Sequence, residues 1–234
     1  MIYVIIPAGG RGSRYSKTTN KLNEPIHKQS VLEHSLGPFL KTDQITGIII
    51  ACPKDQLKHY ASIQKIHQKK IQLTIGGNTR AESVFNGFTA LPSNCTQVLI
   101  HDAARPNPSM ALIQAVISAL QDHPVVIPGL PLTDTIKMVS NNHIQKTISR
   151  DSLVAVQTPQ GFNANTLKKA YQNTTNIESF TDESALLEAN GVYGVIVPGE
   201  KRNIKITHQH DLELMTHYLS NEDHYTPLNT PQMD

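Results

Sequence analysis

The first 21 residues, MIYVIIPAGGRGSRYSKTTNK, place the tightest constraint on how this chain can fold. Residues 2–6 are all apolar or aromatic and mostly β-branched, which is typical of a strand buried on both faces of a parallel sheet. Pro7 ends that strand, and the glycine-rich loop that follows carries Arg11, Arg14 and Lys21. Glycine lets backbone N–H groups converge on a ligand, so the loop suits a polyphosphate, although a purely structural turn is an equal alternative.

Two widespread phosphate-binding motifs are absent from this loop. The P-loop pattern G-x-x-x-x-G-K-[ST] does not occur, and the dinucleotide pattern G-x-G-x-x-G fails because Tyr15 stands where the third glycine belongs. Spacing alone therefore leaves the phosphate site and the structural turn as open alternatives.

Short apolar runs alternate with helical segments along the next hundred or so residues. The pattern predicts strands at 47–51, 71–75, 97–100 and 125–127, and helices at 31–40, 55–67, 78–91 and 110–120. This rhythm predicts an α/β fold with a doubly wound, mainly parallel, Rossmann-like sheet. The loops that follow the strands ending at residues 6, 75 and 100 then lie at carboxyl ends of strands, where such sheets bind ligands, and this convergence favours the phosphate site.

The alternation breaks at residues 133–150. Two segments rich in Thr, Ile and Val flank the turn pair Asn141-Asn142, which predicts a β-hairpin that leaves the sheet. The remaining segments are predicted as a strand at 154–156, helices at 163–171 and 182–190, a strand at 195–197, an extended segment at 203–207 and a helix at 210–219. We therefore expect one domain over residues 1–219, with the hairpin as an excursion, and a disordered tail at 220–234.

Charge and cysteine content narrow the class of protein. The 21 Lys and Arg residues nearly balance the 19 Asp and Glu residues, which argues against a nucleic-acid or membrane-surface partner. No apolar run approaches the roughly 18 residues of a membrane span, and the chain starts on a core strand without a charged leader. Cys52 and Cys95 have no metal-like or disulfide-framework spacing, so we expect a cytoplasmic protein.

Four segments together resemble a known family. PAGGRGSR followed by Lys21 resembles the N-terminal signature of nucleotidyltransferases that activate sugars or sugar alcohols. HDAARP, TPQGF and NIKIT narrow the resemblance to the 2-C-methyl-D-erythritol 4-phosphate cytidylyltransferases of the non-mevalonate isoprenoid route, and it runs from about residue 2 to residue 219. The chain departs from the family pattern at Asn20, where proline is usual, and at Leu22, where glutamine is usual; we interpret both as tuning, with Asn20 leaving the approach to Lys21 less constrained.

The resemblance implies CTP as one substrate and Mg²⁺ or another divalent cation as cofactor. The residues whose backbone would wrap the triphosphate are Ala8, Gly9, Gly10 and Gly12, and those whose positive charge would stabilise the transition state are Arg14, Lys21 and Lys205. The segment that would recognise cytosine contains Gly77, Asn78, Arg80 and Ser83, with Asn78 at a position that is often acidic in the family. Without the resemblance, Lys21 is a solvated loop lysine, Lys205 an outward-facing strand residue, and Arg80 and Ser83 ordinary residues of a first helical turn.

A second group of residues is implied to bind the acceptor, a polyol phosphate. Asp102 follows a buried strand at its carboxyl end, where a carboxylate can hold Mg²⁺ or an acceptor hydroxyl, or else cap a helix. Arg105 and Thr158 match acceptor contacts, whereas His101 fits hydrogen-bonded structure better than a metal ligand. Thr135 and Arg150 lie on the excursion and, in the family, bind the acceptor phosphate across a homodimer in which this arm reaches the partner's site; the alternative for the arm is a surface hairpin.

Two rival functions stay open at this point. A ribitol 5-phosphate cytidylyltransferase shares most of these motifs, although HDAARP and TDESALLE, residues 181–188, favour the methylerythritol enzyme. A catalytically silent nucleotide-binding protein on the same fold is the other rival, and the intact Arg14, Lys21, Asp102 and Lys205 argue against it.

Overall fold

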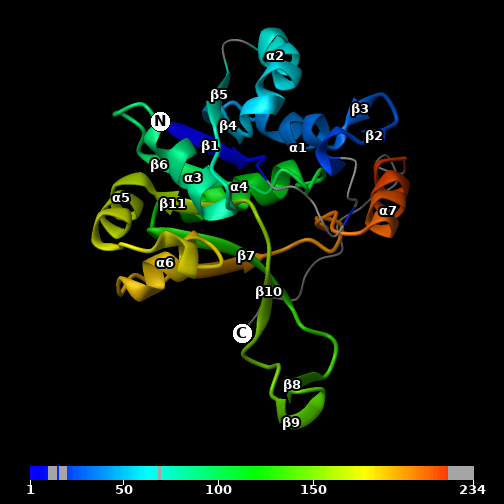
Figure 1. The fold of residues 1–234 in the computed structure, drawn as a ribbon. Coiled ribbons are helices and arrows are strands. Elements are labelled where there is room, and N and C mark those ends of the chain that lie inside the picture. The colour runs from blue at the N-terminus through cyan, green and yellow to red at the C-terminus, as the bar shows by residue number, and fades with distance from the viewer. Residues whose placement is uncertain (10–14, 16–19, 68–69, 221–234) are drawn as a thin grey trace.

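The computed structural model describes residues 1–9, 15, 20–67 and 70–220, and Figure 1 shows a central sheet with helices on both sides and an arm that projects from the body. The helices are α1 (Val31–Leu40), α2 (Leu57–Ile66), α3 (Arg80–Thr89), α4 (Met110–Ala119), α5 (Ala164–Asn173), α6 (Glu183–Ala189) and α7 (Gln209–Ser220), with 3-10 helices η1 (Lys21–Asn23), η2 (Lys54–Gln56) and η3 (Ile177–Ser179). The strands of the central sheet are β1 (Ile2–Pro7), β4 (Ile45–Cys52), β5 (Ile71–Ile75), β6 (Gln97–Ile100), β7 (Val125–Pro131), β10 (Val154–Val156), β11 (Gln160–Asn163) and β12 (Val195–Pro198). Two separate hairpins are formed by β2 (Pro25–Ile26) with β3 (Gln29–Ser30) and by β8 (Ile136–Ser140) with β9 (His143–Ile148).

The predicted doubly wound, mostly parallel sheet is confirmed. Its strands follow the order β10-β7-β11-β6-β1-β4-β5, with β12 paired to β7. β1 lies between β4 and β6 and is parallel to both, and β5 continues the parallel run. The carboxyl ends of β1, β4, β5 and β6 therefore meet at one edge of the sheet, where the loops predicted to bind ligand begin.

One strand of the sheet was not predicted. β11 lies between β6 and β7 and is antiparallel to both. Its sequence, QGFN, has neither an apolar run nor an alternating pattern, yet Gln160, Gly161 and Phe162 are buried. The neighbouring strands, and not its own sequence, make this segment a strand.

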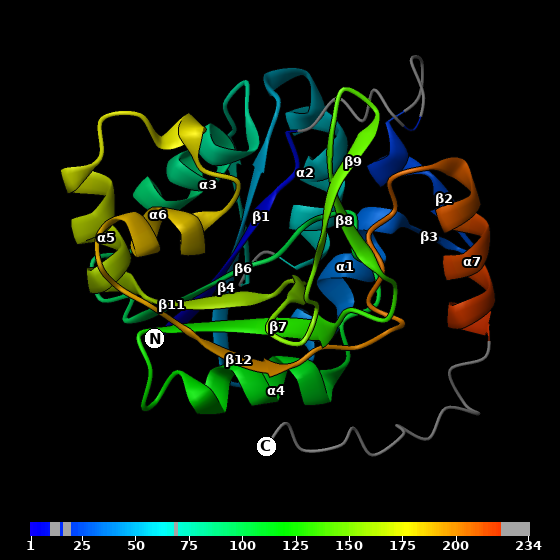
Figure 2. The ribbon, with the colours of Figure 1, turned by 90° about the horizontal axis from the view of Figure 1, so that it is seen from below.

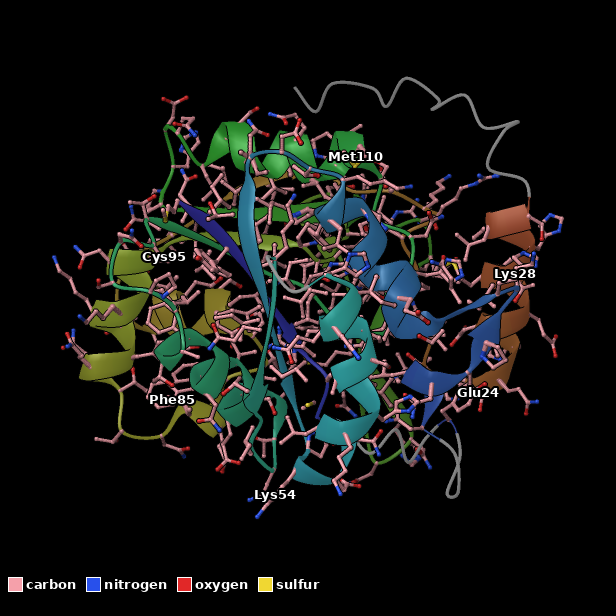
Figure 3. The ribbon with its side chains drawn as sticks, turned by 90° about the horizontal axis from the view of Figure 1, so that it is seen from above. Glu24, Lys28, Lys54, Phe85, Cys95 and Met110 are labelled. Carbon is pink, nitrogen blue, oxygen red and sulfur yellow. The ribbon has the colours of Figure 1, made fainter. Side chains whose placement is uncertain are left out.

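Both faces of the sheet are covered, as the unbroken apolar run at the N-terminus predicts. Val4 and Ile6 pack in a cluster with α1, α2, α4 and α7, whereas Ile5 packs on the other face with α3, α5 and α6. Figure 2 shows α7 beside β2 and β3 on one flank and α3, α5 and α6 on the other. The side-chain view in Figure 3 places Glu24 and Lys28, next to β2 and β3, on the α7 flank, and Phe85 and Cys95 on the opposite flank.

Capping motifs fix where two helices start. The side chain of Ser30 caps α1, and that of Thr79 caps α3. In both helices the side chain of the glutamate three residues later accepts a hydrogen bond from the backbone N–H of the capping residue, which completes a capping box. The predicted start of α1 is thereby confirmed, and the start predicted near Asn78 or Thr79 is confirmed for α3. The first residues of α3 are consequently held at the carboxyl edge of the sheet.

The predicted hairpin at 133–150 is confirmed as an arm. Among the strands of the described residues, β8 and β9 pair with each other alone, and Asn141 and Asn142 join them with φ angles of +48° and +62°, the left-handed region that Asn tolerates. Met138, Val139 and Ile144 on this arm are 48%, 53% and 67% exposed. The use of the arm in dimerisation remains a prediction.

Several boundaries differ from the sequence prediction. β7 runs on to Pro131 instead of ending at residue 127, and α7 reaches Ser220, one residue further than predicted. The short β2–β3 hairpin was missed; its turn contains His27 at φ +53°. The rest of the predicted tail lies outside the described residues. Within the part of the chain that the structure describes, no helix is long and apolar enough to cross a membrane.

Two glycine-to-alanine substitutions should have opposite effects on stability. A Cβ at Gly161 in β11 would lie 2.6 Å from Leu120 and 2.7 Å from Val116, so Gly161→Ala should lower the free energy of unfolding by about 1–3 kcal/mol through overpacking. A Cβ at Gly37 in α1 meets no atom within 4 Å, so Gly37→Ala should raise the free energy of unfolding by up to about 1 kcal/mol. Urea unfolding of both variants measures this, and equal effects would contradict the packing described for β11.

Candidate active site

The site is built around Asp102, which follows β6 at the carboxyl edge of the sheet. Three cations surround its carboxylate: Lys205 Nζ at 2.9 Å, Arg80 Nε at 3.3 Å and Arg105 Nε at 3.5 Å. The Asp102 side chain is 10% exposed, whereas Lys205 is 38% and Arg80 28% exposed. The site therefore joins the start of α3, the loop after β6 and the segment before α7, with its positive charges reaching the surface.

The charges around Asp102 keep it ionised. Burial alone would raise the pKa of its carboxyl, but Lys205, Arg80 and Arg105 outweigh burial and hold this pKa well below its ordinary value. Asp102 in turn fixes three cations that would otherwise repel one another. These ion pairs bring Asp102, Arg105, Arg80 and Lys205, each a candidate site residue from the sequence, to one place; what each of them binds remains a prediction.

A second carboxylate, that of Glu183, joins Asp102 and its three cations in one charge cluster. Its Oε2 lies 3.0 Å from Arg80 Nη1, and its side chain is 4% exposed. Burial raises the pKa of Glu183, and the charge of Arg80 offsets part of that effect. Sequence reasoning did not select Glu183, although it lies in the TDESALLE segment, because a single acidic residue at a helix start carries no sign of its distant partner.

The side chains of His101 and Thr158 form a chain of hydrogen bonds that fixes the backbone of Asp102. The Arg105 carbonyl can only accept, so His101 Nε2–H donates to it over 2.9 Å, and His101 Nδ1 must accept the Thr158 hydroxyl proton over 3.0 Å. The Thr158 oxygen then accepts from the Asp102 backbone N–H at 3.0 Å. Burial lowers the pKa of His101 to about 4, so the ring is neutral and serves as hydrogen-bonded structure, as predicted. A contact between Thr158 and the acceptor remains a prediction.

The segment that carries Lys205 has no regular secondary structure and is fixed by hydrogen bonds. Asn203 Nδ2 donates to the Thr158 carbonyl at 2.8 Å, Arg105 Nη1 donates to the Asn203 carbonyl at 2.7 Å, and Ile206 N donates to the Ala104 carbonyl at 2.8 Å. Asn203 and Ile206 are fully buried. Lys205 is thus held between two anchors, which explains how an extended stretch can present a lysine at a defined position.

Lys21 lies beside this segment. Its Nζ donates to the Ile206 carbonyl at 2.7 Å, so the chain on the N-terminal side of the site meets the segment that carries Lys205. The two departures from the family pattern have structural roles here: the Asn20 side chain accepts from Leu22 N at 3.1 Å and caps η1, and Leu22 is buried in the core. Asn20 therefore caps the turn that begins at Lys21, and the expectation that it leaves the approach to Lys21 less constrained than proline would stays a prediction.

The segment predicted to recognise cytosine is tightly packed against the start of the loop that follows β1. Ser83 Oγ donates to the Thr79 carbonyl at 2.8 Å and accepts from Gly77 N at 3.1 Å, and a Cβ on Gly9 would lie 2.7 Å from it. The close approach explains the need for glycine at position 9. Asn78 N donates to Glu82 at 2.5 Å.

Several backbone donors in this region already have partners. Ala8 N donates to the Ala51 carbonyl at 2.7 Å, and the N–H groups of Gly77 and Asn78 donate as described above. Nucleotide contacts by these three residues therefore have to use other groups, such as the Gly77 carbonyl, which has a 3.4 Å contact with Ser83 Oγ. Gly10, Gly12 and Arg14, which were also predicted to contact the triphosphate, lie outside the described residues.

Within the described part of the chain, no ion pair or side-chain hydrogen bond joins the arm residues Thr135 and Arg150 to Asp102 or the cations around it. Thr135 and Arg150 are exposed, and Arg150 Nη1 donates to the carbonyl of Thr133 on the same arm. The arm projects from the body in Figure 1. Their predicted role in binding the acceptor phosphate therefore concerns a site that this arm would reach in another subunit, and it remains a prediction.

The described residues offer one place for a divalent cation, beside the Asp102 carboxylate. Mg²⁺ in proteins is usually bound by one or two carboxylates together with substrate phosphates and water. Among the described residues no three His, Cys, Asp or Glu side chains are grouped to hold a metal, and both oxygens of Asp102 face cations. The described residues thus form no metal-binding cage of their own; they would fit Mg²⁺ that arrives on a triphosphate, with Asp102 as a single carboxylate near it.

Fold and site together define a class of protein: an α/β protein that gathers cations at the carboxyl edge of a mostly parallel sheet, as proteins that handle phosphorylated substrates do. Comparison with protein families is more specific. The family model described as 2-C-methyl-D-erythritol 4-phosphate cytidylyltransferase matches residues 2–221, and the chain belongs to this family.

Individual relatives agree with the family match. A 2-C-methyl-D-erythritol 4-phosphate cytidylyltransferase of Clostridioides difficile is 34% identical over 225 residues, which cover 95% of each chain. The protein of that name in Gloeobacter violaceus is 38% identical over 216 residues, 90% of this chain and 93% of the relative. The crystal structure of 4-diphosphocytidyl-2C-methyl-D-erythritol synthase from Anaerococcus prevotii superposes with a TM-score of 0.81 at 30% identity, over 94% of this chain and 98% of that one.

The neutral state of His101 should make stability depend on pH. Its pKa is about 4 in the folded protein against an ordinary 6.5, so between these values the unfolded chain binds a proton that the folded protein does not. Stability should therefore fall as the pH falls through this window, by up to about 3 kcal/mol from this residue. His101→Gln, which keeps a donor for the Arg105 carbonyl, should remove that part of the pH dependence.

The comparison needs urea unfolding at several pH values between 4 and 7. His123→Gln, at an exposed position after α4, is the matched control and should keep the pH dependence of the unaltered protein. An equally steep pH dependence in His101→Gln would show that His101 is not held neutral.

Proposed function

We propose that this chain transfers CMP from CTP to 2-C-methyl-D-erythritol 4-phosphate and releases pyrophosphate, as a step of isoprenoid precursor synthesis by the non-mevalonate route. The observation that carries the proposal is the meeting of Lys21 with the Lys205 segment next to the Asp102 cluster, in a chain of this family. The names of the relatives supply the nucleotide and the acceptor.

Transfer of CMP to a phosphate requires fixed positive charge more than it requires a general base. A phosphate oxygen of the acceptor attacks the α-phosphorus of CTP, a new P–O bond forms, and the bond to the β-phosphate breaks as pyrophosphate leaves. The attacking oxygen is already ionised, so the barrier lies in bringing two polyanions together and in stabilising the charge of the transition state. Fixed cations at defined positions meet that need.

The proposed roles of the described residues follow from the positions of their side chains, and the role of Arg14 follows from the family pattern alone. Lys21 and Lys205 flank the Ile206 backbone and neutralise the α-phosphate, together with Arg14. Asp102 orients Lys205 in the free protein, and on acceptor binding its carboxylate accepts from an acceptor hydroxyl. Arg105 keeps the Lys205 segment in place through the Asn203 carbonyl.

Base recognition is proposed to use a carbonyl. The exocyclic amino group of cytosine donates a hydrogen bond, whereas uracil presents an acceptor at the same position. The Gly77 carbonyl is an acceptor that Ser83 occupies only at 3.4 Å, so it can select cytosine over uracil. The tight packing around Gly9 and Ser83 leaves this segment little freedom to adapt to a purine.

Three further parts of the proposal rest on the family and on chemistry. A bound Mg²⁺ would neutralise the triphosphate, and Asp102 is the residue proposed to lie near it. A homodimer would cover the exposed apolar side chains of the β8–β9 arm and bring Arg150 to the partner's acceptor site. The two free cysteines and the phosphorylated substrates suit the cytoplasm, which is where we place the protein.

The direct test is pyrophosphate release from CTP and Mg²⁺ with either acceptor. The proposal requires strong turnover with 2-C-methyl-D-erythritol 4-phosphate and little with ribitol 5-phosphate. The reverse preference would keep the mechanism and change the acceptor, and CTP binding without turnover on either would favour a catalytically silent nucleotide-binding protein.

Removing the Lys21 charge should abolish most turnover without unfolding the protein. We expect Lys21→Ala to lower kcat roughly 100-fold to 1,000-fold, in the range for loss of one transition-state donor. Lys21 is only half-buried, so we expect its loss to lower the free energy of unfolding by about 1 kcal/mol, the order of one hydrogen bond such as that to the Ile206 carbonyl. Lys28→Ala, an exposed lysine on the neighbouring hairpin, is the control, and near-normal turnover of Lys21→Ala would defeat the role of Lys21.

The arm gives a separate prediction. Arg150→Ala should raise the KM for the acceptor about tenfold and leave the KM for CTP nearly unchanged, because a guanidinium is suited to bind a phosphate with two hydrogen bonds. Lys146→Ala, at an exposed position on β9 of the same arm, should change neither value. An equal effect of Arg150→Ala on both substrates would show that the arm does not bind the acceptor phosphate.

A further inference from the structure

Arg80 occupies a position where a cation needs support. It is the first residue of α3, and the free N–H groups of a helix N-terminus make that end positive. Two carboxylates from two other elements hold its guanidinium: Glu183 at Nη1, 3.0 Å away, and Asp102 at Nε, 3.3 Å away. These two carboxylates therefore set the position of the Arg80 guanidinium, whereas the helix sets the position of the Arg80 backbone.

Of the two carboxylates, Glu183 is the dedicated partner. Asp102 divides its charge among Lys205, Arg105 and Arg80, and Arg80 is not the nearest of the three. Glu183 has Arg80 as its ion-pair partner within the described chain, and an unpaired carboxylate at 4% exposure would be costly. The buried charge of Glu183 thus depends on Arg80, whereas Arg80 is paired with Asp102 as well.

The backbone of Glu183 is itself fixed. Glu183 is the first residue of α6, where a carboxylate suits the positive end of the helix. Asp182 before it caps the helix by accepting from Ala185 N at 3.0 Å, and its other oxygen accepts from Gln160 Nε2 of β11 at 2.8 Å. The central sheet therefore sets the place of Glu183, which is 103 residues away from Arg80 along the chain.

We propose that Glu183 is a positioning residue for nucleotide binding: it holds the Arg80 guanidinium at the carboxyl edge of the sheet, next to the segment that recognises the base. The inference rests on the proposed function, because it takes the ligand of Arg80 to be CTP. Glu183 is too buried to contact the nucleotide and acts through Arg80. Without its charge, Arg80 retains Asp102 as its anionic partner and shifts towards a carboxylate that Lys205 and Arg105 already share.

The test is a double-mutant cycle on CTP affinity, measured by calorimetry with Mg²⁺, and on kcat and KM. Glu183→Gln, Arg80→Met and the double variant are compared, with Glu188→Gln, an exposed glutamate of the same helix, as the control. Glu183→Gln should weaken CTP binding about tenfold, and in the Arg80→Met background the same change should cause no further loss, since coupled residues are not additive. Glu188→Gln should bind CTP as the unaltered protein does.

Two results would overturn the inference. One is a Glu183→Gln protein with a lowered melting temperature and unchanged CTP affinity, which would make Glu183 a structural residue only. The other is independent, multiplicative losses in the double variant. If Glu183→Gln fails to fold, Arg80→Met/Glu183→Leu replaces the ion pair by apolar side chains, and that protein must bind CTP no more weakly than Arg80→Met alone.

The measurement separates this inference from the proposed function. Unaltered protein that binds CTP but releases no pyrophosphate would overturn the proposed reaction and leave the role of Glu183 to be decided by the affinities. Unaltered protein that binds no CTP would overturn both.

Discussion

The ion pairs of Asp102 are the interaction on which the candidate site depends. At an effective dielectric constant of about 20, two unit charges 3 Å apart attract by roughly 5 kcal/mol, which is comparable to the several kcal/mol that burying one ion costs. One ion pair would therefore do little more than offset burial of this carboxylate. With Lys205, Arg80 and Arg105 all within 3.5 Å, the carboxylate stays charged and three cations are held at one place before any substrate arrives.

The fold provides this cluster by bringing short loops to one edge of the sheet. β1 and β6 are adjacent and parallel, so the loops after them start side by side, and β11 positions the start of α6 through Gln160. The Lys205 segment is fastened to the loop after β6 by the Ile206 N–H and the Arg105 guanidinium, and to the Thr158 carbonyl by the Asn203 side chain. Charged side chains on loops are thus held by buried, neutral groups, among them His101, whose neutral ring connects Thr158 to the Arg105 carbonyl.

Much of the fold could be predicted because its signals are local. The apolar run of β1, the Ser30 capping box and the Asn141-Asn142 turn each depend on residues next to one another in the sequence. β11 could not be predicted, since Gln160 and Gly161 become strand only between β6 and β7. The same limit applies to the site: motifs identified Asp102, Arg105 and Lys205, whereas Glu183 is recognised only through an ion pair to Arg80, far away in the sequence.

The central claim is that the nucleotide reacts at the charge cluster around Asp102, with Lys21 beside it. The most direct measurement is a crystal structure of the protein with CTP and Mg²⁺. This account predicts that the α-phosphate lies against Lys21 and Lys205, with the cytosine amino group at the Gly77 carbonyl. A triphosphate bound elsewhere, with Lys21 still on the Ile206 carbonyl and Lys205 still on Asp102, would contradict it.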